Sequence, residues 1–273
     1  MDRIDLKILQ LLQQRTKLSG RIGETKRRHG AVIYVPERER ELLARISRRS
    51  KGKLPARAVT AIYREILSSS RAAQGQAPIG LLSASAGLIT LPGRWCFGAC
   101  DQFLPKKTWT GVAAGLEAGA LALALLTGED LARVVRTPGG RHDFFGRWSV
   151  VGDFPSSLEA KTPLARRIFI VMPRGKGAAC VADRILILIE CKSMVNALKS
   201  LLNSMPDRPL AAELLPLRAR PARNGNGAAL VRLKLARPTD GIHATSHVLT
   251  ACKSVAIQVS ILGVYPGTEN YGG

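Results

Sequence analysis

The sequence contains few aromatic residues, few acidic residues and few cysteines. Aromatic residues make up 5% of its 273 residues, and no basic stretch is interleaved with Phe or Tyr on which bases could stack, so the composition is a weak signal for nucleic-acid binding. Five cysteines, an odd and scattered set, favour a reducing compartment. Cys96 and Cys100 have no second cysteine pair or His cluster to complete a site, which disfavours a metal centre.

A long uncharged apolar run is also missing. The most membrane-like segment, residues 111–128, is rich in Ala and Gly and contains Glu117, so we interpret it as a buried helix over 111–126 rather than a membrane span. The first residues are charged, which disfavours a signal peptide. We therefore expect a cytoplasmic protein that does not engage a membrane.

Basic and apolar residues, by contrast, are plentiful. The hydrophobic content of 46% is enough for a core, and 41 Lys and Arg against 20 Asp and Glu give a net charge of +21, which favours anionic partners. Eighteen of the basic residues and seven acids lie in residues 1–74. A basic nucleic-acid-binding module is therefore one alternative, although a small anion would account for the charge equally well.

The chain divides into three blocks of different composition. Residues 1–77 contain few glycines, and interruptions at Gly30, Pro36 and 51–55 predict a three-helix bundle. Residues 78–173 alternate short apolar runs with Gly and Pro turns, as in an α/β block. For residues 180–268 we predict a ferredoxin-like βαββαβ order, with strands at 184–190, 213–220, 228–236 and 255–264 and helices at 193–205 and 241–253. The predicted fold class is thus multidomain, an α bundle followed by α/β parts.

Two cations fall on the apolar stripe of the first predicted helix. The stripe is spaced by three and four residues, as in a helix packed on other helices, and consists of Ile4, Ile8, Leu11, Leu18 and Ile22. Arg15 lies on it and Lys26 lies close to its line. A buried cation without a partner costs several kcal/mol, so each side chain reaches water, pairs with an acid or binds an anion.

Polar residues also border the inner faces of the other two helices. Arg38 and Glu39 each lie one turn before an apolar residue of the second helix, whereas the neighbouring Arg40 points elsewhere. On the third helix the apolar face continues through Ser70 and Gln74. Singly, such residues are ordinary surface features. Together with Arg15 and Lys26 they outline a polar pocket inside a helical bundle.

In type and order, these residues resemble the all-helical chorismate mutase domain. The resemblance covers about 74 residues and is carried by "IDLKILQLLQQRTKLSGRIGETK" (4–26), "YVPERERELL" (34–43) and "IYREILSSSRAAQ" (62–74). It implies an intertwined helical homodimer and an isomerase that converts chorismate to prephenate, in the biosynthesis of phenylalanine and tyrosine. The reaction is a unimolecular rearrangement, so it requires no nucleophile, metal or cofactor.

The resemblance also implies a role for each pocket residue. Arg15 and Arg38 would bind the substrate carboxylates, and Lys26 and Gln74 would face the ether oxygen. Glu39 would bind the ring hydroxyl, and Ser70 would complete the pocket. Relatives carry one more arginine, at a position that would precede Met1, and often a polar residue at the position of Val35. We therefore expect weaker substrate binding rather than loss of the chemistry.

The later blocks resemble the other parts of bifunctional chorismate mutase/prephenate dehydratases. "DRILILIECKSMVNALKSLL" (183–202) and "ILGVYP" (261–266) are similar to a phenylalanine-sensing ACT domain, whose usual "GAL" and "ESRP" motifs are replaced by residues 196–198 and 218–221. An aromatic amino acid is therefore a possible effector. In the middle block the dehydratase motif Thr-Arg-Phe is replaced near residues 166–168 and no "ENS" segment is present, so we expect no dehydratase activity.

A second hypothesis is that the protein is not a catalyst. In it, both enzyme parts have lost their activity and the ACT-like block serves regulation or ligand binding. A chorismate-consumption assay separates this reading from the mutase.

Overall fold

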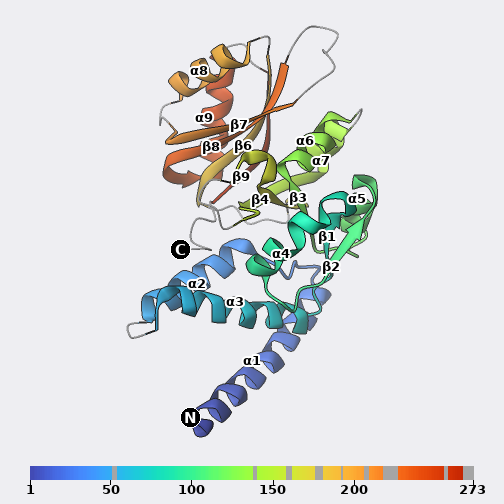
Figure 1. The fold of residues 1–273 in the computed structure, drawn as a ribbon, viewed down its shortest axis with the longest axis vertical. Coiled ribbons are helices and arrows are strands. Elements are labelled where there is room, and N and C mark those ends of the chain that lie inside the picture. Colours follow the sequence, from blue (N-terminus) through green and yellow to red (C-terminus); the bar gives the residue numbers. More distant parts are fainter. Residues whose placement is uncertain are drawn as a thin grey trace. The chain divides into compact units, whose positions relative to one another are not determined.

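The computed structural model describes residues 1–50, 54–137, 140–157, 162–175, 181–191, 193–205, 209–217, 227–254 and 258–266. The described chain forms two compact units, residues 1–125 and residues 126–270. Figure 1 shows the elements of both. None of the described helices is long and apolar enough to cross a membrane.

The first unit begins with three helices, as predicted. They are α1 (Asp2–Arg28), α2 (Pro36–Arg49) and α3 (Ala56–Ala73). Pro36 occupies the first turn of α2, where the absence of its N–H costs nothing, and Pro55 is the N-cap of α3. The predicted interruptions therefore coincide with the ends of the helices.

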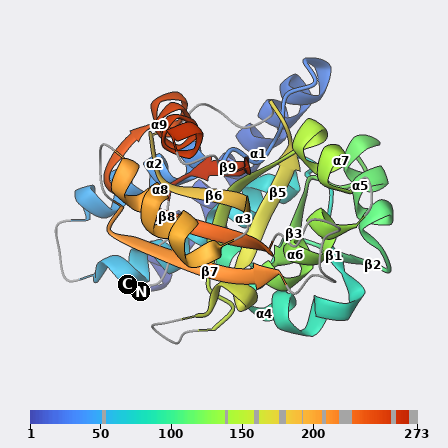
Figure 2. The same cartoon turned by 90° about the horizontal axis from the view of Figure 1, so that it is seen from above.

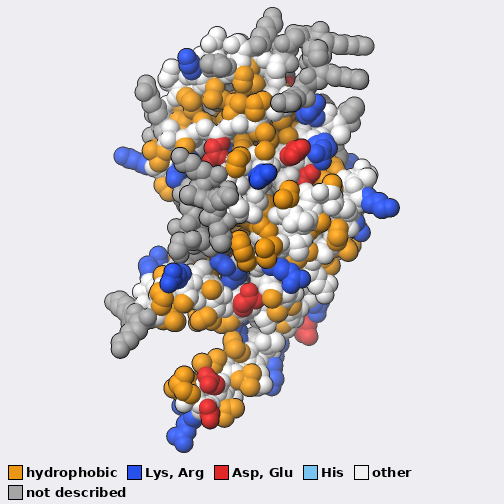
Figure 3. Space-filling view, viewed as in Figure 1, with side chains coloured by type: hydrophobic (Ala, Val, Ile, Leu, Met, Phe, Trp, Pro, Cys, Tyr) orange, Lys and Arg blue, Asp and Glu red, His pale blue; other side chains and the backbone are white. Residues whose placement is uncertain are grey.

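The apolar stripe of α1 is exposed within one chain. Helix α1 has 27 residues and so spans about 40 Å, whereas α2 and α3 have 14 and 18 residues. Figure 1 shows the N-terminal half of α1 projecting beyond the other two helices, and Figure 3 shows hydrophobic side chains on that half. Exposed apolar residues of α1 include Ile4, Leu6, Ile8, Leu9, Leu11, Leu18 and Ile22.

An α/β part completes the first unit. It contains β1 (Ile79–Leu82), α4 (Ala86–Phe97), β2 (Phe103–Lys106), α5 (Trp109–Glu117) and β3 (Leu123–Thr127), whose last two residues belong to the second unit. Strand β1 pairs in parallel with both β2 and β3. All residues of β1 and β3 are buried, as is typical of strands in parallel sheets.

The predicted helix over 111–126 is wrong. Helix α5 ends at Glu117, the chain turns at Gly119, whose φ is +70°, and β3 begins at Leu123. Glycine adopts this left-handed conformation without the steric cost that a Cβ would add. A continuous run of Ala, Gly and Leu has no period that separates a buried helix from a buried strand, which is why the sequence pattern failed here.

The second unit contains two antiparallel strand groups. After α6 (Gly128–Arg136) and α7 (Gly140–Arg147), β4 (Trp148–Phe154) pairs with β5 (Ile168–Pro173). The elements β6 (Val181–Cys191), α8 (Met194–Ser204), β7 (Ala211–Leu217), β8 (Gly227–Asp240), α9 (Gly241–Ser254) and β9 (Gln258–Tyr265) follow. Their order is the predicted βαββαβ, and the strands form one sheet in the order β7-β8-β6-β9.

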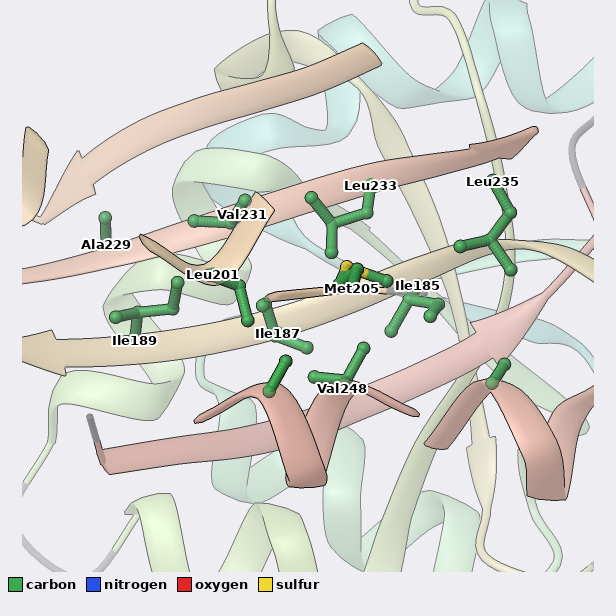
Figure 4. Packing of buried hydrophobic residues seen from close by; sticks show 12 residues of the cluster. Ile185, Ile187, Ile189, Leu201, Met205, Ala229, Val231, Leu233, Leu235 and Val248 are labelled. Carbon is green, nitrogen blue, oxygen red and sulfur yellow. The ribbon is translucent and has the colours of Figure 1, made fainter. Parts of the chain in front are cut away.

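Both faces of this sheet are buried at its central strands β6 and β8, whereas the edge strand β7 is largely exposed. On one face, alternate residues of β6 and β8 pack on Leu201 of α8 and Val248 of α9, as Figure 2 and the close-up in Figure 4 show. On the other face, Leu186 and Leu188 are also buried. Gly263 of β9 lies against Val150 of β4 there, so closely that a Cβ would come within 2.1 Å of the Val150 carbonyl oxygen. The central strands of the sheet therefore lie in the interior of the second unit.

Candidate active site

Arg15 and Ser70 meet at one backbone carbonyl. The half-buried Arg15 of α1 donates from Nη1 to the carbonyl oxygen of Ile66 at 3.1 Å, and the buried Ser70 donates from Oγ to the same oxygen at 2.7 Å. Burial lowers the pKa of Arg15, and electrostatic interactions with Tyr63 and Glu39 oppose that effect. The predicted cation on the α1 stripe thus faces α3, within electrostatic range of Glu39.

Lys26 lies at the other end of the same face of α1. Its ammonium donates to the carbonyl oxygen of Ile33 at 2.9 Å. The pKa of Lys26 is lowered, first by burial and then by the positive charge of Arg38, and Glu39 opposes both. Arg38 itself is exposed. Lys26, Arg38 and Glu39 therefore lie near one another, with Glu39 turned inward and Arg38 toward water.

Glu39 is held by a residue that the sequence interpretation did not single out. Arg71 of α3 is 3% exposed and donates from Nη1 to both carboxylate oxygens of Glu39, each at 2.6 Å. Burial raises the pKa of Glu39; Arg71 and Lys26 act to lower it, and Asp101 acts to raise it. The carboxylate is thus a charge centre to which cations of α1 and α3 are directed.

Arg71 makes further contacts with the segment that follows α4. Its Nη2 donates to Asp101 Oδ2 at 2.7 Å and to the Phe97 carbonyl oxygen. The guanidinium carbon is also 5.7 Å from the ring centre of Tyr34 and 5.8 Å from that of Phe97, which are cation–π distances. Burial alone would lower the pKa of Arg71, but Glu39 and Asp101 raise it, so this guanidinium remains charged.

Gln74 ends α3 beside a close approach of α1. Its Nε2 donates to the carbonyl oxygen of Ser70 at 3.1 Å, and its buried Oε1 has no hydrogen-bond partner among the described residues. Gly23 of α1 packs directly on its backbone, because a Cβ at that position would lie 2.5 Å from the Gln74 oxygen. Arg27 also donates to this oxygen, at 3.0 Å. The absence of a side chain at Gly23 thus allows α1 to approach the end of α3 closely.

Five of the six predicted site residues therefore lie on inward-facing surfaces of the three helices, and the sixth, Arg38, is exposed. The signals for Arg71 were present in the sequence. It lies one position after Ser70 in "SSSRAAQ" and so faces a slightly different direction on the helix. Its second partner, Asp101, is 30 residues away beyond an intervening helix, and no local pattern connects the two.

The second unit has a buried ion network of its own. Asp153 of β4 accepts from Arg167, and its Oδ2 lies 3.2 Å from Nε of Arg232 of β8. Arg232 also donates to Glu213 at 2.6 Å. Tyr265 is fully buried, and burial followed by the charge of Asp153 raises its pKa. Arg167 lies in the segment where the dehydratase motif is replaced, and here it serves the network.

The ACT-like motifs are only partly described. Asn196 is exposed on α8, and Ala197 and Leu198 pack toward the sheet, whereas the segment 218–221 lies outside the described residues. In the part of the chain that the structure describes, no group of three or more His, Cys, Asp or Glu side chains could hold a metal ion.

Comparisons with known proteins find relatives of the three N-terminal helices. Residues 1–75 match the family described as chorismate mutase type II. The bifunctional chorismate mutase/prephenate dehydratase of Aquifex aeolicus is 36% identical over 121 residues, which are 43% of this chain and 33% of that protein. The protein of the same name from Neisseria gonorrhoeae is 42% identical over 82 residues, 30% of this chain and 22% of that protein.

A third curated relative has a different name. The T-protein of Enterobacter agglomerans is 37% identical over 73 residues, 26% of this chain and 19% of that protein. The chain thus spans a third or less of the length of these curated relatives. The Aquifex match is longer than the 75 residues of the family match, so that similarity extends beyond the three helices.

Two solved structures are similar over 69% of this chain. One is the prephenate dehydratase from Streptococcus mutans, at 18% identity, 97% of that chain and a TM-score of 0.43. The other is described as GqqA, a novel type of quorum-quenching acylase, at 17% identity, 94% of that chain and a TM-score of 0.45. Both TM-scores are below 0.5, so neither likeness decides fold or function. The family match, in contrast, contains all six predicted site residues, so residues 1–75 of this chain are similar to the chorismate mutase type II family.

Proposed function

We propose that the N-terminal helices catalyse the rearrangement of chorismate to prephenate. The observation that carries the proposal is the concentration of charge around Glu39. Four cations, Arg15, Lys26, Arg38 and Arg71, are connected with two carboxylates, Glu39 and Asp101, through pairwise electrostatic interactions and hydrogen bonds. Four positive and two negative charges give the cluster a net charge of +2, which a dianion such as chorismate would neutralise.

The site would act first by holding a flexible substrate in its reactive shape, because a unimolecular rearrangement gains most from orientation. Arg15 and Arg38 would bind the two carboxylates, for which the planar guanidinium is well suited. Arg15 now donates to the neutral carbonyl of Ile66. A substrate carboxylate would offer it a stronger, charge-assisted hydrogen bond.

The site would also stabilise the charge that develops as the C–O bond breaks. Lys26 is a half-buried ammonium whose pKa is lowered by its surroundings, and a fixed cation acts most strongly where water is excluded. Gln74 would donate a hydrogen bond to the ether oxygen, and Glu39 would accept a hydrogen bond from the ring hydroxyl. Ser70 would line the pocket. These steps use side chains of this chain alone.

The test is direct. Purified protein mixed with chorismate is expected to consume it and form prephenate, measured by the loss of chorismate absorbance and by product chromatography. A bicyclic diacid that mimics the transition state should raise the melting temperature. Protein that is folded, as judged by circular dichroism, but shows neither turnover nor this shift would exclude the proposal.

An intertwined homodimer is part of the same proposal. Its support is the exposed apolar face of α1, which includes Ile8 at 50% and Leu11 at 64% exposure, because contiguous apolar surface of this kind usually marks an interface. Sedimentation velocity should give a dimer, and Leu11→Glu should shift it toward the monomer. The exposed Lys17→Glu is the matched control on the same helix.

For the remainder of the chain we propose three domains, 1–77, 78–173 and 180–268, the last a ferredoxin-like ACT-type domain. The observed βαββαβ order supports that assignment. We also propose that dehydratase activity is absent, because Arg167 of the replaced motif binds Asp153. Phenylpyruvate formation from prephenate would contradict this. A phenylalanine-dependent rise in melting temperature would identify the effector.

A cytoplasmic location is likewise proposed. Cys96, Cys100 and Cys191 are free thiols, which suits a reducing compartment. Fractionation of cells that produce the protein would test it.

A further inference from the structure

A short segment after α4 is docked on the outer face of α3. The backbone N–H of Ala99 donates to Glu65 Oε2 at 2.9 Å, and that of Cys100 donates to Ser68 Oγ at 3.1 Å. Gly98, with φ at +104°, lies so close that a Cβ would come within 2.5 Å of Ser68 Cβ. Residues 98–101 therefore have a defined position against α3.

The segment delivers one carboxylate into a ready-made set of donors. Asp101 accepts from Ser68 Oγ at 2.7 Å, from Gln76 Nε2 at 2.8 Å and from Arg71 at 2.7 and 3.3 Å. It is 8% exposed. Every one of these donors belongs to α3 or to the residues just after it, so α3 provides a built site for this side chain.

Arg71 connects the two faces of α3, because its side chain forms ion pairs on both. Residues 65, 68 and 71 are spaced by three and share the face that receives the segment, whereas Ser70 and Gln74 are on the face toward α1. The Arg71 guanidinium reaches both sides, because it binds Asp101 on one and Glu39 on the other. One cation is thus shared by two carboxylates.

We propose that Asp101 and Arg71 are positioning residues of the mutase site, through which the segment after α4 orients Glu39 and sets its charge. This inference rests on the proposed function and names two residues outside the six predicted ones. Arg71 fixes the Glu39 carboxylate by two hydrogen bonds. Asp101 competes for that guanidinium, so it sets how much positive charge Glu39 experiences.

This competition predicts the direction in which the pKa of Glu39 changes when Asp101 loses its charge. Without the charge of Asp101, Arg71 is committed to Glu39 alone, and a like charge near Glu39 is removed, so the pKa of Glu39 should fall. The other groups that act on Glu39 stay in place. They are Arg15 and Lys26 of α1, Arg38 of α2 and Arg71 of α3. The Cys96 thiol of α4 is also within electrostatic range, and burial keeps it neutral by raising its pKa to about 12.

The experiment measures Glu39 directly as well as turnover. Side-chain carboxyl carbons are followed by NMR between pH 3 and 9 in the full chain, with Glu39 assigned from Glu39→Gln, and the acid limb of kcat/KM is recorded in parallel. In Asp101→Asn both midpoints are expected about one pH unit lower than in the wild type, as for a nearby like charge removed. In Glu65→Gln, which loosens the same segment but leaves the Arg71 contacts in place, both should remain at the wild-type value.

The possible outcomes are distinct. An unchanged Glu39 titration in folded Asp101→Asn, or an equal shift in Glu65→Gln, would overturn the inference. A shifted titration in a protein that turns over no chorismate would show that Asp101 sets the charge of Glu39, but it would remove the proposed function and with it the positioning role in a mutase site. If Asp101→Asn does not unfold cooperatively, Ser68→Ala replaces it. That variant deprives Asp101 of one donor, so Asp101 draws more on Arg71 and Glu39 should titrate higher, and an unchanged or lowered value would contradict the inference.

Discussion

Each of the two units contains a buried ion cluster, and the central charge has the opposite sign in the two clusters. In the first unit one guanidinium, Arg71, lies between two carboxylates, Glu39 and Asp101. In the second, one carboxylate, Asp153, lies between two guanidiniums, Arg167 and Arg232. The second cluster is closed by Glu213, which pairs with Arg232, so its charges balance.

This difference distinguishes a cluster whose charges balance from one with excess positive charge. A buried network whose charges balance and whose members are hydrogen-bonded stabilises one arrangement of the chain. Around Glu39 the charges do not balance, because Arg15, Lys26 and Arg38 add positive charge that the two carboxylates do not neutralise. The first cluster is therefore suited to bind an anion and the second is not.

The largest expected effect is on the balanced cluster. Asp153→Asn leaves two buried guanidiniums without their shared carboxylate, and breaking a buried pair typically costs about 3–5 kcal/mol of the free energy of unfolding. Urea unfolding followed by tryptophan fluorescence measures it. Asp240→Asn, in an exposed pair with His243, is the control and should cost less than about 0.5 kcal/mol. A loss for Asp153→Asn no larger than that of the control would remove the distinction between the clusters.

The second effect is on catalysis. Lys26→Ala should lower kcat by on the order of 10²–10³-fold, because it removes a fixed donor at the charge that develops in the transition state. The melting temperature should change little, since Lys26 is only half buried. Lys17→Ala, an exposed lysine on the same helix, should keep wild-type turnover. Near-wild-type kcat for Lys26→Ala would show that the positive cluster is not the active site.

A third prediction concerns the spacing of α1 and α3. Gly23→Ala places a methyl group 2.5–2.9 Å from backbone atoms of Gln74, and overpacking of this kind costs about 1–3 kcal/mol of the free energy of unfolding. It should also raise KM, since Lys26 and Gln74 move apart. Gly20→Ala has no atom closer than 3.9 Å and gains up to about 1 kcal/mol in helix propensity. Equal melting temperatures for the two variants would contradict this account.

The smallest effect is the response to pH. Burial raises the pKa of Glu39, so activity that needs its carboxylate should be lost at a higher pH than for an ordinary glutamate. The contribution of Glu39 to the free energy of unfolding has the opposite pH dependence. A folded-state pKa above the unfolded value gives stability that is present at low pH and is lost as the pH rises through the folded pKa.

Glu39→Gln separates the two responses, since glutamine does not titrate. The acid limb of the pH–rate profile should disappear in this variant, and the pH dependence of the melting temperature should weaken. An acid limb unchanged from the wild type would show that another group controls it.

Much of the three-helix bundle could be predicted from the sequence, because helix limits and inward polar residues are local properties. Gly30, Pro36 and Pro55 mark where helices end or begin, and Arg15 is conspicuous as a cation among apolar residues spaced by three and four. The βαββαβ order was predictable for the same reason, since strands such as 184–190 are continuous apolar runs between turn residues.

The parts that could not be predicted depend on contacts between distant residues. Arg71 gains its role from Asp101, 30 positions away, and an arginine near a helix end is by itself unremarkable. Asp153 likewise depends on Arg232 of a different strand. The strand β3 was missed because Ala, Gly and Leu fit a buried helix as well as a buried strand, and only the turn at Gly119 separates them.

The anchoring of Asp101 at the end of α3 has a consequence for how the chain can be divided. A cut after residue 77 would respect the helices, yet it would remove one of the two acids that Arg71 binds and bare a guanidinium that is now almost fully covered. The smallest piece that preserves the surroundings of Glu39 as they exist in the whole chain should thus extend past residue 101, and in a shorter one Glu39 should titrate differently.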